Sequence, residues 1–129
     1  MIEAGITALL QADGTLSGLI GVRLYPVLVP EAPTYPCLSY QMISGLPSYT
    51  FQGRECEQAR MQFDAWSDTY GGCKTVQKAL RDVLDVYSGT LTDGTKLLGA
   101  FRGIGIDFFE DVPRSYRVMR EYILYFVEP

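Results

Sequence analysis

Residues 59–84 read ARMQFDAWSDTYGGCKTVQKALRDVL, and this stretch decides the fold class. In its first part Met61, Phe63 and Ala65 alternate with polar residues, which predicts a strand over 59–67 with one buried and one solvent-facing side. Trp66 departs from the alternation, because it falls on the polar side. An amphipathic segment follows at once, so a strand leads directly into a helix.

The helical part of this stretch has apolar residues at a spacing of 3.6, which predicts one buried face. This stripe comprises Val76, Leu80, Val83, Leu84 and Tyr87, and the polar positions comprise Lys74, Gln77, Lys78, Arg81, Asp82 and Asp85. Residues 67–69, Ser-Asp-Thr, offer an N-cap. Gly71 and Gly72 weaken the first turn, so we expect the helix to begin nearer Cys73 and to end at about Tyr87.

Towards the N-terminus, residues 2–10 have one apolar helical face, and a shorter helical turn is expected from a cap at Thr15 or Ser17 to about Ile20. Residues 22–25 then favour a strand. The following segment, 26–36 (PVLVPEAPTYP), contains four of the seven prolines and predicts an extended surface connection or an edge strand.

Residues 37–44 favour another strand, which Gly45-Leu46-Pro47 should interrupt. The polar residues 45–58 predict a protruding hairpin-like loop. Asp93-Gly94 predicts a two-residue turn between short strands, and a glycine-containing strand should then continue to Phe109. After a turn at 110–114, the last strand, 116–127, is apolar on both faces. Such a strand lies in the centre of a sheet, or one of its faces meets a partner.

This order predicts a single α+β domain over 1–129, with a mainly antiparallel sheet and two or three helices on one face. The chain has 129 residues, of which 47% are hydrophobic, so it is long enough to form its own core. It has no histidine, which excludes Ser-His-Asp and Cys-His catalysis and histidine zinc sites. A net charge of −4 disfavours wrapping of DNA, because affinity for DNA depends mainly on neutralising phosphates.

Three cysteines at wide spacing predict free thiols in a reducing cytoplasm, not a disulfide framework or a zinc ribbon. The first residues lack the basic region of a signal peptide, and no apolar run is long enough to cross a bilayer, so we expect no targeting segment and no membrane partner.

Candidate chemical sites are weak. Residues 99–105, GAFRGIG, contain G-x-G, but they lie between strand patterns, so bulges are the better interpretation than a dinucleotide site. Asp107, Glu110 and Asp111 have the oxygen ligands of a hard divalent cation, but a solvated loop is the better interpretation. Cys56 lies in a charged segment, yet it has no histidine partner to make it a nucleophile. We therefore expect no catalytic residue, no metal and no cofactor.

Aromatic residues at positions expected to be exposed are more informative. These are Tyr49 and Phe51 in the predicted loop, Trp66 on the polar side of its strand, and Tyr116 and Tyr125 on the last strand. Because monomers rarely expose large apolar patches, this set favours a protein that assembles with neighbours.

Four segments in this order resemble the tail-completion, or tail-terminator, proteins of long-tailed bacteriophages. They are MIEAGITALLQADGTLSGLIGVRLYP, YPCLSYQMISG, the stretch 59–84 quoted above, and YRVMREYILYFVE, which together span nearly the whole chain. None of them is a catalytic signature, and the resemblance supplies no catalytic residue.

The resemblance implies a structural virion protein that is assembled in the host cytoplasm. It implies a ring, typically hexameric, at the head-proximal end of the tail, which ends polymerisation of the tail tube protein and docks onto the head–tail connector. An acidic ring fits this role, because DNA would pass through its bore without specific binding.

We expect the segments 45–58 and 107–115 to face axial neighbours. The candidate subunit or axial interface residues are Tyr49, Phe51, Arg54, Trp66, Asp107, Glu110, Asp111, Arg114, Tyr116 and Tyr125. Two alternatives remain open: a neck or head-closure protein of the same virion, and a small cytoplasmic ligand-binding or enzymatic α+β domain.

Overall fold

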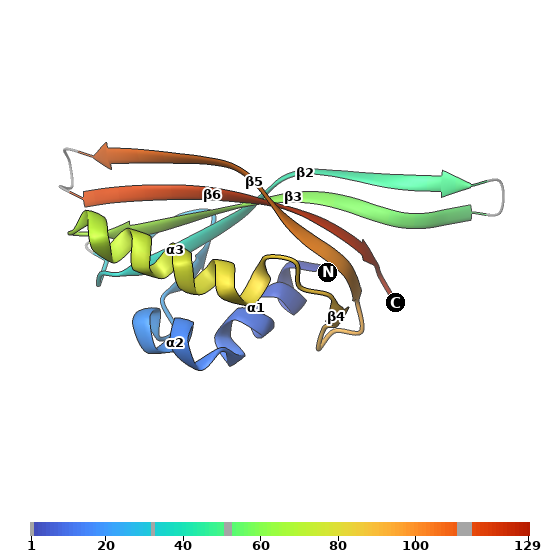
Figure 1. Ribbon diagram of the computed structural model, residues 1–129, viewed down its shortest axis with the longest axis horizontal. Helices are drawn as coiled ribbons and strands as arrows, with labels where there is room; N and C mark the ends of the chain where they lie inside the picture. Colours follow the sequence, from blue (N-terminus) through green and yellow to red (C-terminus); the bar gives the residue numbers. More distant parts are fainter. Residues whose placement is uncertain (1, 32, 51–52, 111–114) are drawn as a thin grey trace.

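The computed structural model of the chain describes residues 2–31, 33–50, 53–110 and 115–129. Within these ranges six strands form one sheet in the order β1-β2-β3-β6-β5-β4, and three helices cover one of its faces (Figure 1). All strand pairs are antiparallel except β1 with β2. The predicted α+β class is confirmed, as is the placement of the helices on one face.

Two long hairpins form most of the sheet. One consists of β2 (Cys37–Thr50) and β3 (Gly53–Ser67), and the other of β5 (Lys96–Glu110) and β6 (Ser115–Val127). Their closed ends point in opposite directions (Figure 1). Pairing of β3 with β6 joins the hairpins, so the last strand lies centrally, which is one of the two positions expected for it.

The first hairpin corrects the sequence prediction. Gly45-Leu46-Pro47 does not interrupt β2, and the described residues of 45–58 form a protruding hairpin, as expected, but as paired strands that continue the ladder between β2 and β3 (Figure 1). The pairing of β2 with β3 has a register shift between Met42 and Ser44, just before this segment. Beyond Tyr40, β2 has no partner on its other side among the described residues, and an edge strand tolerates a proline such as Pro47.

The N-terminal segment forms α1 (Ile2–Ala12) and α2 (Gly14–Ile20). Asp13 caps α2, because its carboxylate accepts a hydrogen bond from the backbone N–H of Leu16 at 2.9 Å; the prediction of Thr15 or Ser17 as cap was wrong. The strand predicted at 22–25 is β1 (Leu24–Pro26). No strand occurs among the described residues of 27–36, as expected of an extended connection.

Helix α3 (Tyr70–Leu84) begins earlier and ends earlier than predicted. The Thr69 hydroxyl accepts a hydrogen bond from the N–H of Gly72 at 3.0 Å, and this cap compensates for the weak glycines of the first turn. After Leu84 the backbone of Asp85 is extended and Val86 has a positive φ of 57°, so the helix cannot continue to Tyr87.

The short hairpin is confirmed, but its turn is longer than predicted. β4 (Gly89–Thr90) pairs with Lys96 and Leu97, so residues 91–95 form the connection instead of Asp93-Gly94 alone. The thiols of Cys37 and Cys73 are free and buried, and burial raises the pKa of each to about 11.

One continuous core lies between the helices and the sheet. The predicted alternation is confirmed, since Met61, Phe63 and Ala65 all face this core. Its largest fully buried side chains are Tyr122, Phe63, Ile6, Leu10, Leu16, Ile20, Leu38, Met61, Leu80, Leu84, Leu97 and Leu124. The described helices include none long and apolar enough to span a membrane.

Candidate functional site

Strand β5 forms an open edge of the sheet over most of its length. From Gly99 to Glu110 it pairs with β6 on one side, whereas β4 reaches only Lys96 and Leu97 on the other. Register shifts between Leu97 and Gly99 and between Arg102 and Gly105 match the bulges expected from the glycines. Among the described strands none covers the outer edge of β5 beyond Leu97, although the Val86 N–H donates to the Ala100 carbonyl at 2.7 Å, so the edge is available for a partner from Phe101 onwards.

The side chains on this edge are apolar and exposed. All residues from Phe101 to Phe109 are exposed, including Phe101 at 47%, Ile104 at 58% and Ile106 at 43%. Phe108 and Phe109 extend the apolar surface to the closed end of the hairpin. We call Phe101, Ile104, Ile106, Phe108 and Phe109 the β5 edge patch. Exposed apolar side chains in this number along an open sheet edge are characteristic of a protein–protein contact.

The opposite edge of the sheet also exposes apolar side chains. They belong to β2, to the segment between β1 and β2, and to the short connection before β1, and comprise Val22, Val27, Leu28, Met42 and Ile43. We call this set the β1–β2 edge patch. Val27 has a φ of 63°, a conformation that costs energy for a β-branched residue, and its N–H donates to the carbonyl of Tyr40 at 2.8 Å.

Trp66 lies on the sheet face that the helices leave uncovered. Its indole N–H donates to the Ser39 hydroxyl at 3.1 Å, and the side chain is half-buried. The Arg117 guanidinium lies 5.3 Å from the Trp66 ring and 4.1 Å from the Phe108 ring. Trp66 is therefore connected through Arg117 to the β5 edge patch.

Tyr116 and Tyr125 lie on opposite faces of β6. Tyr116 packs against Phe109 and Tyr70, with ring centroids 5.0 and 5.9 Å apart. Tyr125 packs against Phe101 at 6.0 Å. Each tyrosine thus supports one aromatic residue of the β5 edge patch from a different side.

Asp107 forms ion pairs and hydrogen bonds with a tyrosine and two basic side chains. Its carboxylate accepts a hydrogen bond from Tyr70 at 2.7 Å and pairs with Lys74 at 3.1 Å and Arg120 at 3.4 Å. These interactions, with the Tyr70 hydrogen bond the largest, lower the pKa of Asp107. Among the described residues no group of three potential metal ligands occurs.

The other predicted interface residues give no contacts to compare. Tyr49, Arg54 and Glu110 lie in β2, β3 and β5, but their side chains are outside the described structure. Phe51, Asp111 and Arg114 lie outside the described residues altogether. Cys56 is in β3 and half-buried.

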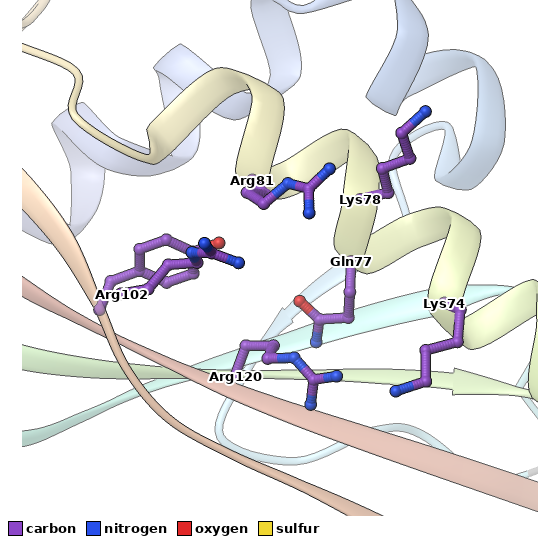
Figure 2. Close-up of a pocket in the computed structure, with 7 residues that line it drawn as sticks. Lys74, Gln77, Lys78, Arg81, Arg102 and Arg120 are labelled. Carbon is purple, nitrogen blue, oxygen red and sulfur yellow. The ribbon is translucent and has the colours of Figure 1, made fainter.

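A basic pocket between α3 and the β5–β6 hairpin was not predicted (Figure 2). Its lining residues are Lys74, Gln77, Lys78, Arg81, Arg102, Arg120 and Tyr122. The sequence places Lys74, Lys78 and Arg81 on one helical face, which is a signal of a basic helix surface. Arg102 and Arg120 join them only through strand pairing, which no local pattern reveals.

The position of Gln77 corrects a further prediction, which placed this residue on the solvent-facing side of the helix. It is only 5% exposed, and its amide nitrogen donates to the carbonyls of Phe63 at 3.0 Å and Val118 at 2.7 Å. Gln77 therefore binds α3 to β3 and β6 at the base of the pocket.

Comparison with known proteins agrees with the geometry of an assembly protein. The sequence pattern of the family described as "Tail completion protein gp17" matches residues 4–123. The fold is similar to that of a chain in a structure titled "Virion of native gene transfer agent (GTA) particle", with a TM-score of 0.75 and 16% sequence identity. That match covers 97% of this chain and 93% of the other. Comparison with curated proteins gives no significant match.

Proposed function

We propose that this chain, which belongs to the tail completion protein gp17 family, forms a ring that ends the tail tube of a phage-like virion and joins it to the head. Membership of this structural family makes it a component of a virion tail and confirms the expectation that it is not an enzyme. The fold shared with a chain of a gene transfer agent virion supports a role in the assembled particle.

The observation that carries the proposal is the pair of apolar patches at opposite edges of one sheet. A closed ring needs two different surfaces on each subunit, so that one subunit's first surface meets its neighbour's second. The β5 edge patch and the β1–β2 edge patch meet this requirement, because strand order places them at opposite sides of the sheet.

The same contact would close the ring. If each β5 edge patch packs on the β1–β2 edge patch of the next copy, the ring closes without leaving either patch exposed. The net charge of −4 per chain disfavours tight contact with DNA phosphates in the bore, so DNA slides through it.

Electron microscopy of particles assembled without this gene tests the function. Overlong or irregular tails separated from filled heads are the expected result. Tails of normal length beside unjoined heads would transfer the role to the neck or to head closure. Intact infectious particles would overturn the virion role.

The ring itself is tested by native mass spectrometry of the chain bound to tail tubes and then released. Six copies of the 14.4 kDa chain give an expected mass of about 86 kDa. Replacing Ile104 and Ile106 with aspartate should abolish this species while the monomer stays folded, because both side chains are exposed. Lys96→Gln, on the same strand but outside the patch, is the matched control.

A further inference from the structure

The basic pocket has features of a binding site that the ring does not explain. It is a hollow of about 160 Å³ between α3, β5 and β6, lined by five cationic side chains in a chain of net charge −4. Figure 2 shows that Lys74, Lys78 and Arg81 come from the helix, whereas Arg102 and Arg120 come from the strands below it.

The strand backbone makes room for this arrangement. A Cβ atom on Gly105 would lie 2.8 Å from both the Cδ and a guanidinium nitrogen of Arg120. The absence of a side chain at Gly105 therefore leaves room for the Arg120 side chain in its observed position at the pocket. Gly105 of the GAFRGIG segment therefore has a role in packing, unlike the glycines of a dinucleotide-binding site.

The positive charges of the pocket are incompletely neutralised. Asp107 pairs with both Lys74 and Arg120, and Asp85 pairs with Arg102 at 3.3 Å. Arg81 has only its exposed neighbour Asp82, at 3.8 Å. Lys78 has no ion-pair partner among the described residues, so five cations face three carboxylates.

Two buried polar atoms of the lining have no hydrogen-bond partner among the described residues. One is the side-chain oxygen of Gln77 and the other is the hydroxyl of Tyr122, which is 0% exposed. The two hydrogen bonds from the Gln77 nitrogen fix its amide with the oxygen turned away from the strands (Figure 2). Burial raises the pKa of Tyr122 to about 12, so its hydroxyl stays protonated and can donate.

We propose that this pocket binds an acidic side chain of a partner protein, together with the peptide backbone beside it. The carboxylate accepts hydrogen bonds from Tyr122 and the arginines, and a backbone N–H donates to the Gln77 oxygen. An acidic peptide supplies both an acceptor and a donor, whereas a phosphodiester supplies acceptors only.

Hexaglutamate, with both ends blocked, is the probe, and titration of the isolated chain at low salt is the measurement. We expect a dissociation constant of about 0.1–1 mM, weakened by salt, and much weaker binding of hexaglutamine. Because the titration uses the isolated chain, its outcome does not depend on ring formation. If hexaglutamate does not bind, the proposed ring is unaffected, and if no ring forms, the titration result still stands.

Tyr122→Phe is the most specific variant, because it removes only the unpartnered hydroxyl and should not reduce stability. It should weaken hexaglutamate binding by about 2–10-fold, as expected for loss of one hydrogen bond. Lys78→Gln should weaken it by about 2–5-fold, and Lys96→Gln, an exposed lysine outside the pocket, should have no effect.

Equal weakening by Lys78→Gln and Lys96→Gln would show non-specific attraction and overturn the proposal. The same conclusion follows if hexaglutamate binds no better than hexaglutamine. Tighter binding of a DNA duplex, weakened by the same two pocket variants, would assign the pocket to nucleic acid instead.

Discussion

Strands β5 and β6 lie side by side, have similar apolar content and differ sharply in burial. Central β6 has Val118, Tyr122 and Leu124 fully buried under the helices. Its neighbour β5 exposes every residue from Phe101 to Phe109. The difference arises from position in the sheet, because α3 packs mainly against β3 and β6, whereas β5 lies beyond β6 towards the sheet edge. Apolar residues therefore stabilise the fold in one strand and are available for assembly in the other.

The largest effect on stability is expected from a comparison of two alanine variants, one in each strand. Leu124→Ala removes a fully buried side chain and should lower the free energy of unfolding by about 2–5 kcal/mol. Ile104→Ala should change it by less than about 0.5 kcal/mol, because the side chain is 58% exposed. Urea denaturation measures both. Similar losses from the two variants would mean that β5 is part of the core.

Gln77 tests whether the helix-covered face also depends on polar contacts. Gln77→Ala leaves the carbonyls of Phe63 and Val118 without their donor and should cost about 1–3 kcal/mol. Gln11→Ala, at an exposed position of α1, is the control for loss of a glutamine from a helix. Equal urea midpoints for the two variants would be inconsistent with the bridging role of Gln77.

The cap of α3 should contribute less. Thr69→Ala removes the acceptor for the Gly72 N–H, with an expected loss of about 1 kcal/mol in unfolding free energy. Thr92→Ala, in the exposed connection after β4, should have almost no effect. A thermal unfolding midpoint that falls for Thr92→Ala as much as for Thr69→Ala would argue against the cap.

The smallest effect concerns Asp107 on the exposed strand. Its pKa is lowered in the folded state, so its stabilising contribution is present above the unfolded value of 3.8 and is lost as pH falls through the folded pKa. The wild type should therefore be slightly more stable than Asp107→Asn at pH 7, and this advantage should disappear as the pH falls through the lowered folded pKa of Asp107. Urea midpoints measured across this range, with Glu31→Gln as control, test the sign. An advantage that grows in acid would contradict it.

Much of the architecture could be predicted from local patterns. The alternation around Phe63 and the helical stripe after Thr69 gave the strand–helix unit, and the two-faced strand 116–127 indicated a central position. The uninterrupted β2 could not be predicted, because Gly45 and Pro47 are unfavourable in most strands and are tolerated only at a sheet edge. Whether a strand lies at the edge depends on how all strands of the sheet pair, which the residues of one strand do not reveal.

The candidate surface was predictable in part. Trp66 and Asp107 were predicted as interface residues from their own positions, but their partners Arg117 and Tyr70 come from distant segments. The exposed residues Ile104 and Ile106 were missed, since an apolar strand segment is ordinarily expected to be buried. The basic pocket depends on a register between β5 and β6 that the residues alone do not specify.

Hydrogen–deuterium exchange at residues 101–109 most directly tests whether the β5 edge patch is the assembly surface. The isolated protein is compared with the assembled particle. The account predicts fast exchange in the isolated protein for amides that do not bond to β6, and exchange slowed at least about tenfold after assembly. Unchanged exchange at 101–109, with new protection only elsewhere on the chain, would contradict the assignment of the β5 edge patch as the assembly surface.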